Sequence, residues 1–113
     1  MHNPYILNIK KTEAEDNIKT EKDAENFTYS WLSEEGFCNS GFYGSGKAEW
    51  FQVGGRFRNL LGEKAIVKYN GEKEFVKICK ELADDNFDYI DTDYEEGVKL
   101  EVGDWLVVVD YHD

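Results

Sequence analysis

The stretch WLVVVDY, residues 105–111, is a continuous apolar run that closes with an aspartate and a tyrosine. Its valines favour extended backbone. Because successive side chains of a strand point to opposite faces, an unbroken apolar run predicts a strand that is buried on both faces. We therefore expect residues 105–111 to form a core strand.

Working outward from this strand, we expect three further strands and two helices. The strands are predicted at residues 4–11, 47–57 and 64–70, and the helices at residues 12–36 and 72–86.

The two helices are defined by different signals. Residues 12–36 contain two possible capping boxes, Thr12 with Glu15 and Thr20 with Asp23, so two starting points are open. The second helix shows one apolar face at the spacing i, i+3, i+4 and i+7. That face consists of Phe75, Ile78, Cys79 and Leu82.

The resulting order, β-α-β-β-α-β, is typical of the ferredoxin-like arrangement, an antiparallel sheet with two helices on one face. The alternative is a longer sheet, to which the acidic residues 81–104 add a hairpin. The chain has 113 residues, 41% of them hydrophobic, which is enough for one α+β domain, residues 1–113, with its own core.

The formal net charge of −11 is unevenly distributed, because residues 81–104 hold ten acidic side chains and a single base, Lys99. So acidic a chain is poorly suited to nucleic-acid backbones and to anionic membranes, and it suits a basic protein partner. No calcium loop is expected, because the required glycine and final glutamate are missing. The alternative is a solvated acidic hairpin without a partner. The expected partner-binding residues are Asp84, Asp85, Asp88, Asp91, Asp93, Glu95 and Glu96.

Composition excludes several other classes of protein. Two cysteines, Cys38 and Cys79, are too few for a disulfide scaffold and predict free thiols in a reducing cytosol. They show no zinc-ligand spacing with His2 or His112, so we expect neither a metal nor a cofactor. No run approaches the roughly 18 apolar residues of a membrane span. We therefore expect a cytoplasmic protein.

A glycine-rich stretch, GFYGSGK at residues 41–47, matches a phosphate-binding loop up to its last position. Ala48 stands where such a loop has the serine or threonine that holds magnesium. A buried strand should precede the loop and a helix should follow it, and neither is expected here. We interpret the stretch as a simple loop.

The stretch WFQVGGRF, residues 50–57, places two glycines in a predicted strand, where each costs roughly 0.5–1 kcal/mol. Glycine there permits a bulge or the close approach of a backbone or a ligand. With the arginines that follow, the stretch could recognise a planar or phosphorylated ligand. The structural alternative pairs Arg56 with Asp110 or a nearby acid and buries Trp50 in the core. The candidate ligand-binding residues are Trp50, Gly54, Gly55, Arg56, Arg58, Asp110 and His112.

Asp110 and His112 lie two residues apart and therefore on one face of the last strand. Such a pair could orient a general base. The sequence places no nucleophile beside it, so we expect a non-catalytic protein and keep an enzyme as an alternative.

Two stretches, AEWFQVGGRFRNLL at residues 48–61 and the closing LVVVDYHD, resemble a family of small phage and prophage proteins of unassigned function. In that family an aromatic residue, usually tryptophan, follows the arginine; here it is Phe57. The resemblance implies a phage or mobile-element origin, and hence a host-cell cytosol, but no activity. The matching residues are Trp50, Gly54, Gly55, Arg56, Phe57, Asp110 and His112.

Three functional hypotheses are consistent with these patterns. In the first, the protein is a counter-defence inhibitor similar to an anti-CRISPR protein, and its acidic face binds a basic nucleic-acid groove of a host nuclease complex. In the second, it sequesters a nucleotide immune signal at the Gly-Gly-Arg segment. In the third, it is a small enzyme that uses Asp110 and His112.

Overall fold

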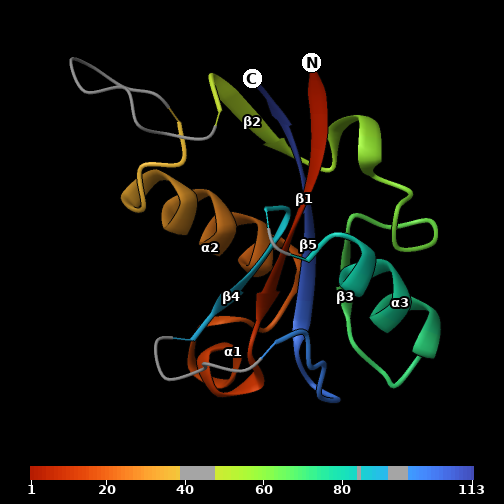
Figure 1. Cartoon of the computed structure of the whole chain (residues 1–113). Coiled ribbons are helices and arrows are strands. Elements are labelled where there is room, and N and C mark those ends of the chain that lie inside the picture. Colours follow the sequence, from red (N-terminus) through yellow and green to blue (C-terminus); the bar gives the residue numbers. More distant parts are fainter. Residues whose placement is uncertain (39–47, 84, 92–96) are drawn as a thin grey trace.

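A computed structural model describes residues 1–38, 48–83, 85–91 and 97–113 of the chain. Strands, α-helices and one short 3-10 helix, η1, alternate along it (Figure 1). In chain order the elements are β1 His2–Ile9, α1 Lys11–Asn17, α2 Glu21–Glu34, β2 Trp50–Val53, η1 Gly55–Phe57, β3 Ile66–Lys68, α3 Lys73–Glu81, β4 Phe87–Ile90 and β5 Trp105–His112.

Strand β5 lies inside the sheet, as its apolar run predicts. Every residue from Trp105 to Tyr111 is buried. Along its whole length β5 pairs antiparallel with β1, from Ile9 opposite Trp105 to His2 opposite His112. The prediction of a strand that is buried on both faces is therefore confirmed.

Strands β2 and β3 lie end to end along the other edge of β5, and both pair antiparallel with it. Between them, the Val108 carbonyl accepts from the Gly54 N–H, and the Val108 N–H donates to the Ala65 carbonyl, both at 2.8 Å. Residues 54–65 therefore leave this edge and return to it at one position of β5. Because β2 and β3 run in the same direction, they do not form the neighbouring antiparallel pair of a ferredoxin-like sheet.

Strand β4 is an addition to the expected set. It pairs parallel with β1, from Ile6 opposite Phe87 to Ile9 opposite Ile90. The sequence instead predicted a helix through residue 86 and acidic turns after it. The sheet has the order β2-β5-β1-β4, with β3 also beside β5. The ferredoxin-like prediction is therefore wrong, and the described residues form an α+β fold with three α-helices and a mixed five-stranded sheet.

The helices cover both faces of the sheet rather than one (Figure 1). Helices α1 and α2 pack Ala14 and Leu32 into a core with Val107, whereas α3 packs Cys79 into a second core with Val108. The prediction of two helices on one face is therefore wrong. The reason is β5 itself: its side chains are apolar on both faces, and each face needs a helix to exclude water.

The expected helix at residues 12–36 is two helices, separated by residues 18–20. Ile18 ends α1 with φ −127° and is buried. Helix α2 then begins with the second of the two possible capping boxes, since Thr20 and Asp23 bond reciprocally. Asp23 also accepts the Lys19 backbone N–H, and these bonds lower the pKa of its carboxyl.

Candidate functional site

Asp110 is the centre of a polar cluster at the end of the sheet where the two chain termini lie (Figure 1). Its side chain is buried. One carboxylate oxygen, Oδ1, lies 2.8 Å from Nδ1 of His2, and the other, Oδ2, accepts the backbone N–H of Arg56 at 2.9 Å. Both oxygens are therefore engaged inside the protein, and a ligand would have to displace these partners to reach them.

The two glycines of the Gly-Gly-Arg motif are explained by the close packing of residues 54–56 against β5 and Ala65. Gly55 has a φ of +53°, and a Cβ there would lie 2.7 Å from the Cβ of Asp110. Gly54 has a φ of +80°, and its Cβ would lie 3.1 Å from the Cβ of Ala65. Glycine adopts such backbone conformations without strain. The motif lets Asp110 cap η1, so the glycines need no ligand to explain them.

Three rings form a group beside Asp110. Trp50 and His112 are stacked, with centroids 5.6 Å apart and planes 6° apart. His2 meets each of them edge-on at 5.3 Å. Trp50 remains 41% exposed, so the alternative in which it belongs to the core is wrong. Nδ1 of His112 lies 3.5 Å from a carboxylate oxygen of Glu49 but without hydrogen-bond geometry.

Arg56 and Arg58 both have exposed side chains. Arg56 gives Asp110 its backbone N–H, and the expected ion pair between its guanidinium and Asp110 is not formed. Arg58 donates from Nη1 to the Gly55 carbonyl at 3.2 Å. Two cationic side chains therefore lie at the surface of the segment that follows β2.

The structure thus gathers the predicted ligand-binding residues around the C-terminal end of β5, and it adds His2. The Asp-His pair is Asp110 with His2 rather than Asp110 with His112. His2 is 108 positions from Asp110 in the chain. Only the register of β1 with β5 brings the two together, so no local signal in the sequence could have identified the pair.

The acidic segment supplies three described carboxylates at the β4 edge. Asp85 precedes β4 and is exposed, and so is Asp88 within it. Asp88 accepts the Tyr5 hydroxyl at 3.0 Å and the Tyr89 N–H at 2.9 Å, and Asp91 accepts the Thr12 hydroxyl at 3.2 Å. The other predicted partner-binding residues lie outside the described residues, as do residues 41–47 of the glycine-rich stretch. They are Asp84, Asp93, Glu95 and Glu96.

Two acids of the same segment are paired internally with Lys10 and Lys11. Asp104 is fully buried and lies 2.7 Å from Lys10 Nζ, and Glu101 lies 3.2 Å from it. Burial alone would lower the pKa of Lys10, but the hydrogen bonds and charges of the two carboxylates raise it. Hydrogen bonds from Lys10 and Lys11 lower the pKa of Glu101. These two acids are therefore not available to a partner.

The middle of the chain has the opposite charge. Residues 56–80 contain seven bases and three acids, a net charge of +4, in a chain whose total is −11. All seven basic side chains are exposed, and among the described residues only Lys64 has an acidic partner, Glu21 at 2.7 Å. This basic side, residues 56–80, was missed because the total charge conceals it. Its bases are Arg56, Arg58, Lys64, Lys68, Lys73, Lys77 and Lys80.

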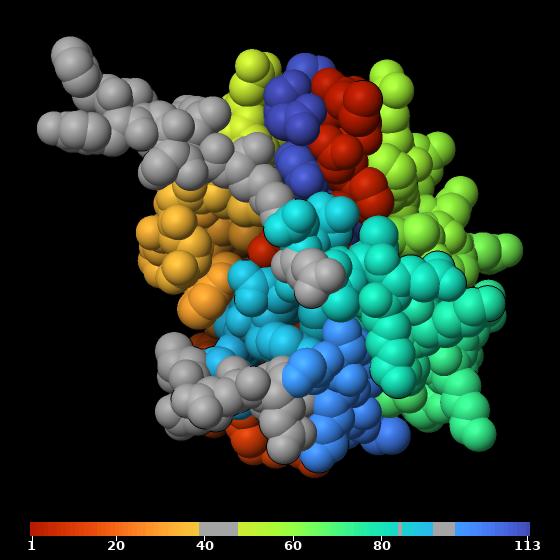
Figure 2. Space-filling view, viewed as in Figure 1, coloured from red at the N-terminus to blue at the C-terminus, as the bar shows by residue number. Residues whose placement is uncertain are grey.

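The fold places most of the two charges on different sides of the sheet. Residues 11–35 carry eight acids and three lysines, and residues 85–91 carry three acids and no base; together they form the acidic side. It covers the α1–α2 face and the β4 edge, whereas the basic side covers the α3 face. At the β3 edge the two sides meet, because Lys64 pairs with Glu21 of α2 and Lys68 lies beside α1. In Figure 2, α2 (orange) and α3 (teal) lie on opposite flanks of the molecule.

Both cysteines are free thiols, as predicted. Cys79 is buried in the core beneath α3, and this burial raises its pKa to about 12. Cys38 is half-buried, and burial raises its pKa as well. Neither thiol has the lowered pKa that a nucleophile requires.

Within the described residues no helix is long and apolar enough to span a membrane, and no three side chains are grouped to hold a metal ion. No protein-family model, curated protein or solved structure matches the chain.

Proposed function

We propose that the protein is a non-catalytic binding protein whose acidic side docks on the cationic groove of a nucleic-acid-binding protein. The observation that supports this proposal is the separation of charge across the sheet. Eleven acids and three bases lie in residues 11–35 and 85–91, while residues 56–80 carry a net charge of +4, most of it on the other side.

This separation gives the molecule an electric dipole across the sheet in addition to its net negative charge. A cationic groove attracts the acidic side and repels the basic side, so electrostatic steering selects the orientation as well as the rate of encounter. Exposed carboxylates at the β4 edge, such as Asp85 and Asp88, would take the places of phosphate groups in the groove. Binding of this kind weakens as salt is added.

In its finer form the proposal names a host nuclease complex of the CRISPR type as the partner. The resemblance to small phage proteins supports this choice, because a phage protein that occupies a nuclease's nucleic-acid groove would block its activity. The function would then be counter-defence in the cytosol of the infected cell.

A pull-down from nuclease-treated bacterial lysate tests the proposal. The bait is the wild-type protein, the acidic-side variant D85N/D88N/D91N, or the matched control E63Q/E72Q/E74Q, which changes net charge equally on the basic side. We expect the wild type and the control to retain nucleic-acid-binding proteins. The acidic-side variant should not retain these proteins, and added duplex DNA should release them from the wild type. If the acidic-side variant retains the same proteins as the control, the proposal is wrong.

A second candidate function is favoured by the gathering of Trp50, Arg56 and His112 around Asp110. A nucleotide could stack on the exposed Trp50 ring and place its phosphate against Arg56. Calorimetry with cyclic nucleotides and ADP-ribose should then show heat with wild type and little with Arg56→Gln. Absence of heat with all of these ligands would eliminate this candidate.

A further inference from the structure

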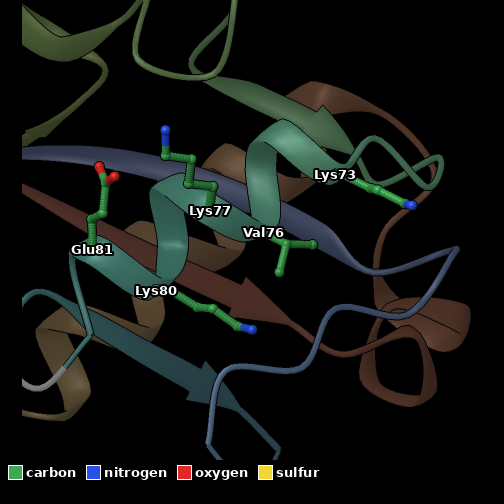
Figure 3. Close-up of a pocket in the computed structure, with 5 residues that line it drawn as sticks. All are labelled: Lys73, Val76, Lys77, Lys80 and Glu81. Atoms are coloured by element: carbon green, nitrogen blue, oxygen red, sulfur yellow. The ribbon is translucent and has the colours of Figure 1, made fainter.

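Helix α3 carries an open surface hollow of about 510 Å³ that the proposed acidic docking side does not include. Figure 3 shows the side chains around it, with Lys77 and Glu81 on one side of the helix axis and Val76 and Lys80 on the other. The residues that line it are Lys73, Val76, Lys77, Lys80 and Glu81.

The three lysines form an unneutralised row. Lys73, Lys77 and Lys80 follow the spacing i, i+4 and i+7, which places them about one turn apart within one sector of the helix surface. Within this sector Lys77 lies toward Glu81 and Lys80 toward Val76 (Figure 3). All three are exposed, and none has an acidic partner among the described residues. Like charges at this spacing repel each other. Glu81, the acid of the lining, forms no ion pair with these lysines within the described part of the chain, so an anionic ligand would relieve the repulsion.

The floor of the hollow is apolar. Val76 is partly exposed between the lysines, whose methylene stems add further apolar surface. A nucleic-acid backbone would use the ammonium groups but not this floor. A peptide that alternates carboxylates with an apolar side chain would use both.

We propose that the α3 hollow binds an acidic peptide segment of a partner protein. Its apolar side chain lies over Val76, and its carboxylates contact Lys73, Lys77 and Lys80. The total charge of −11 does not prevent this, because the Debye length at physiological salt is about 8 Å. Lysines in direct contact therefore outweigh carboxylates on the far face of the sheet.

Fluorescence anisotropy with defined probes tests this site. The probes are a labelled Glu-Asp-Leu-Asp-Glu peptide, the same peptide with serine for leucine, and a short single-stranded oligothymidylate. The proteins are wild type, the hollow variant K73Q/K77Q/K80Q, and the control K19Q/K22Q/K64Q, which removes equal charge elsewhere.

We expect wild type and control to bind the leucine peptide alike, and the hollow variant to bind it about tenfold more weakly, since three surface charge contacts are lost. Val76→Ser should weaken the binding of the leucine peptide to the level at which wild type binds the serine peptide. Equal binding by hollow variant and control would overturn the proposal. So would tighter binding of the oligonucleotide than of the leucine peptide, which would make the row a phosphate-binding surface.

Discussion

At the scale of single residues, the contact between Gly55 and Asp110 shows why an unusual motif can be structural. The backbone at residue 55 passes so close to the carboxylate that no side chain fits between them. Asp110 uses this closeness to accept the Arg56 N–H. The motif therefore fixes the chain where it leaves β2, beside the stacked rings of Trp50 and His112.

Substitution of Gly55 by alanine should destabilise the protein by about 2–4 kcal/mol. Left-handed backbone strain contributes about 1–3 kcal/mol, and displacement of Asp110 leaves buried polar groups without partners. The matched control is Gly62→Ala, because Gly62 also has a positive φ, +81°, but has open space around it. Urea unfolding measures both; equal losses of stability would show that the contact with Asp110 is unimportant.

A second prediction concerns the buried cation. Lys10→Met should cost about 3–5 kcal/mol, because it leaves Asp104 charged, buried and without its cationic partner. Lys11→Met is the control, since Lys11 contacts the same Glu101 from an exposed position and should change stability by less than about 1 kcal/mol. If the variant K10M unfolds at the same urea concentration as K11M, the buried pair of Lys10 and Asp104 does not stabilise the fold.

The sequence made some of these residues visible and hid others for a physical reason. Two glycines and an arginine within a strand pattern are locally unusual, so the Gly-Gly-Arg segment was identified as special. The partner that explains it, Asp110, and the neighbour His2 are brought to it only by strand register. Local patterns contain no information on register between distant strands.

At the scale of elements, the strands and helices with clear periodicity were predicted and β4 was not. Strand β5 and helix α3 follow the apolar patterns that the sequence shows. β4 is only four residues long, Phe87–Ile90, and lies among acidic residues that are typical of turns. It becomes a strand because β1 offers it a parallel edge, which is tertiary information.

Within β1, Asn8 is a polar side chain among buried apolar ones. Its side chain is fully buried, and neither amide atom has a hydrogen-bond partner in the described protein. It lies opposite Leu106 on one side and Tyr89 on the other. Asn8→Leu should therefore stabilise the protein by about 1 kcal/mol, because an unsatisfied amide is replaced by an apolar group of similar size.

The control for Asn8 is Asn59→Leu at an exposed position, which should leave stability unchanged. Both variants are compared by the midpoint of urea unfolding, with the slope of the transition as a check on two-state behaviour. A loss of stability in N8L would mean that the amide is satisfied in solution, for example by a buried water.

At the scale of the whole molecule, stability should decline in alkali. Burial raises the pKa of Cys79 to about 12 and raises that of Tyr5 above its ordinary value, with Asp88 adding to the shift. In Lys10 burial opposes the shift, but Asp104 and Glu101 outweigh it and raise the pKa.

Each of these groups binds its proton more tightly in the folded than in the unfolded chain. Their contributions are therefore complete below the unfolded pKa values, 9.0 for the thiol and 10.5 for the lysine, and are lost as pH rises through the folded values. Urea midpoints should fall steadily above about pH 9, and Tyr5→Phe should flatten part of that fall. A midpoint that is constant or rises over this range would contradict the prediction.

The charge map is also a property of the whole molecule. The sequence showed the acidic segment directly, but it could not show that η1 and α3, with five of the seven bases of residues 56–80, would lie on the face of the sheet opposite α1 and α2. That arrangement follows from β5 being apolar on both faces, which places helices on both. The separation of charge is thus a consequence of the core as much as of the surface.

The most direct test of the account is a map of surface potential by NMR. Paramagnetic relaxation of backbone amides is measured with a cationic and with an anionic nitroxide probe of the same size. The account predicts that the cationic probe relaxes amides of α1, α2 and β4 more strongly, and that the anionic probe relaxes those of α3 and η1 more strongly. Preference for the cationic probe over the entire surface, α3 included, would contradict the separation of charge and both docking proposals with it.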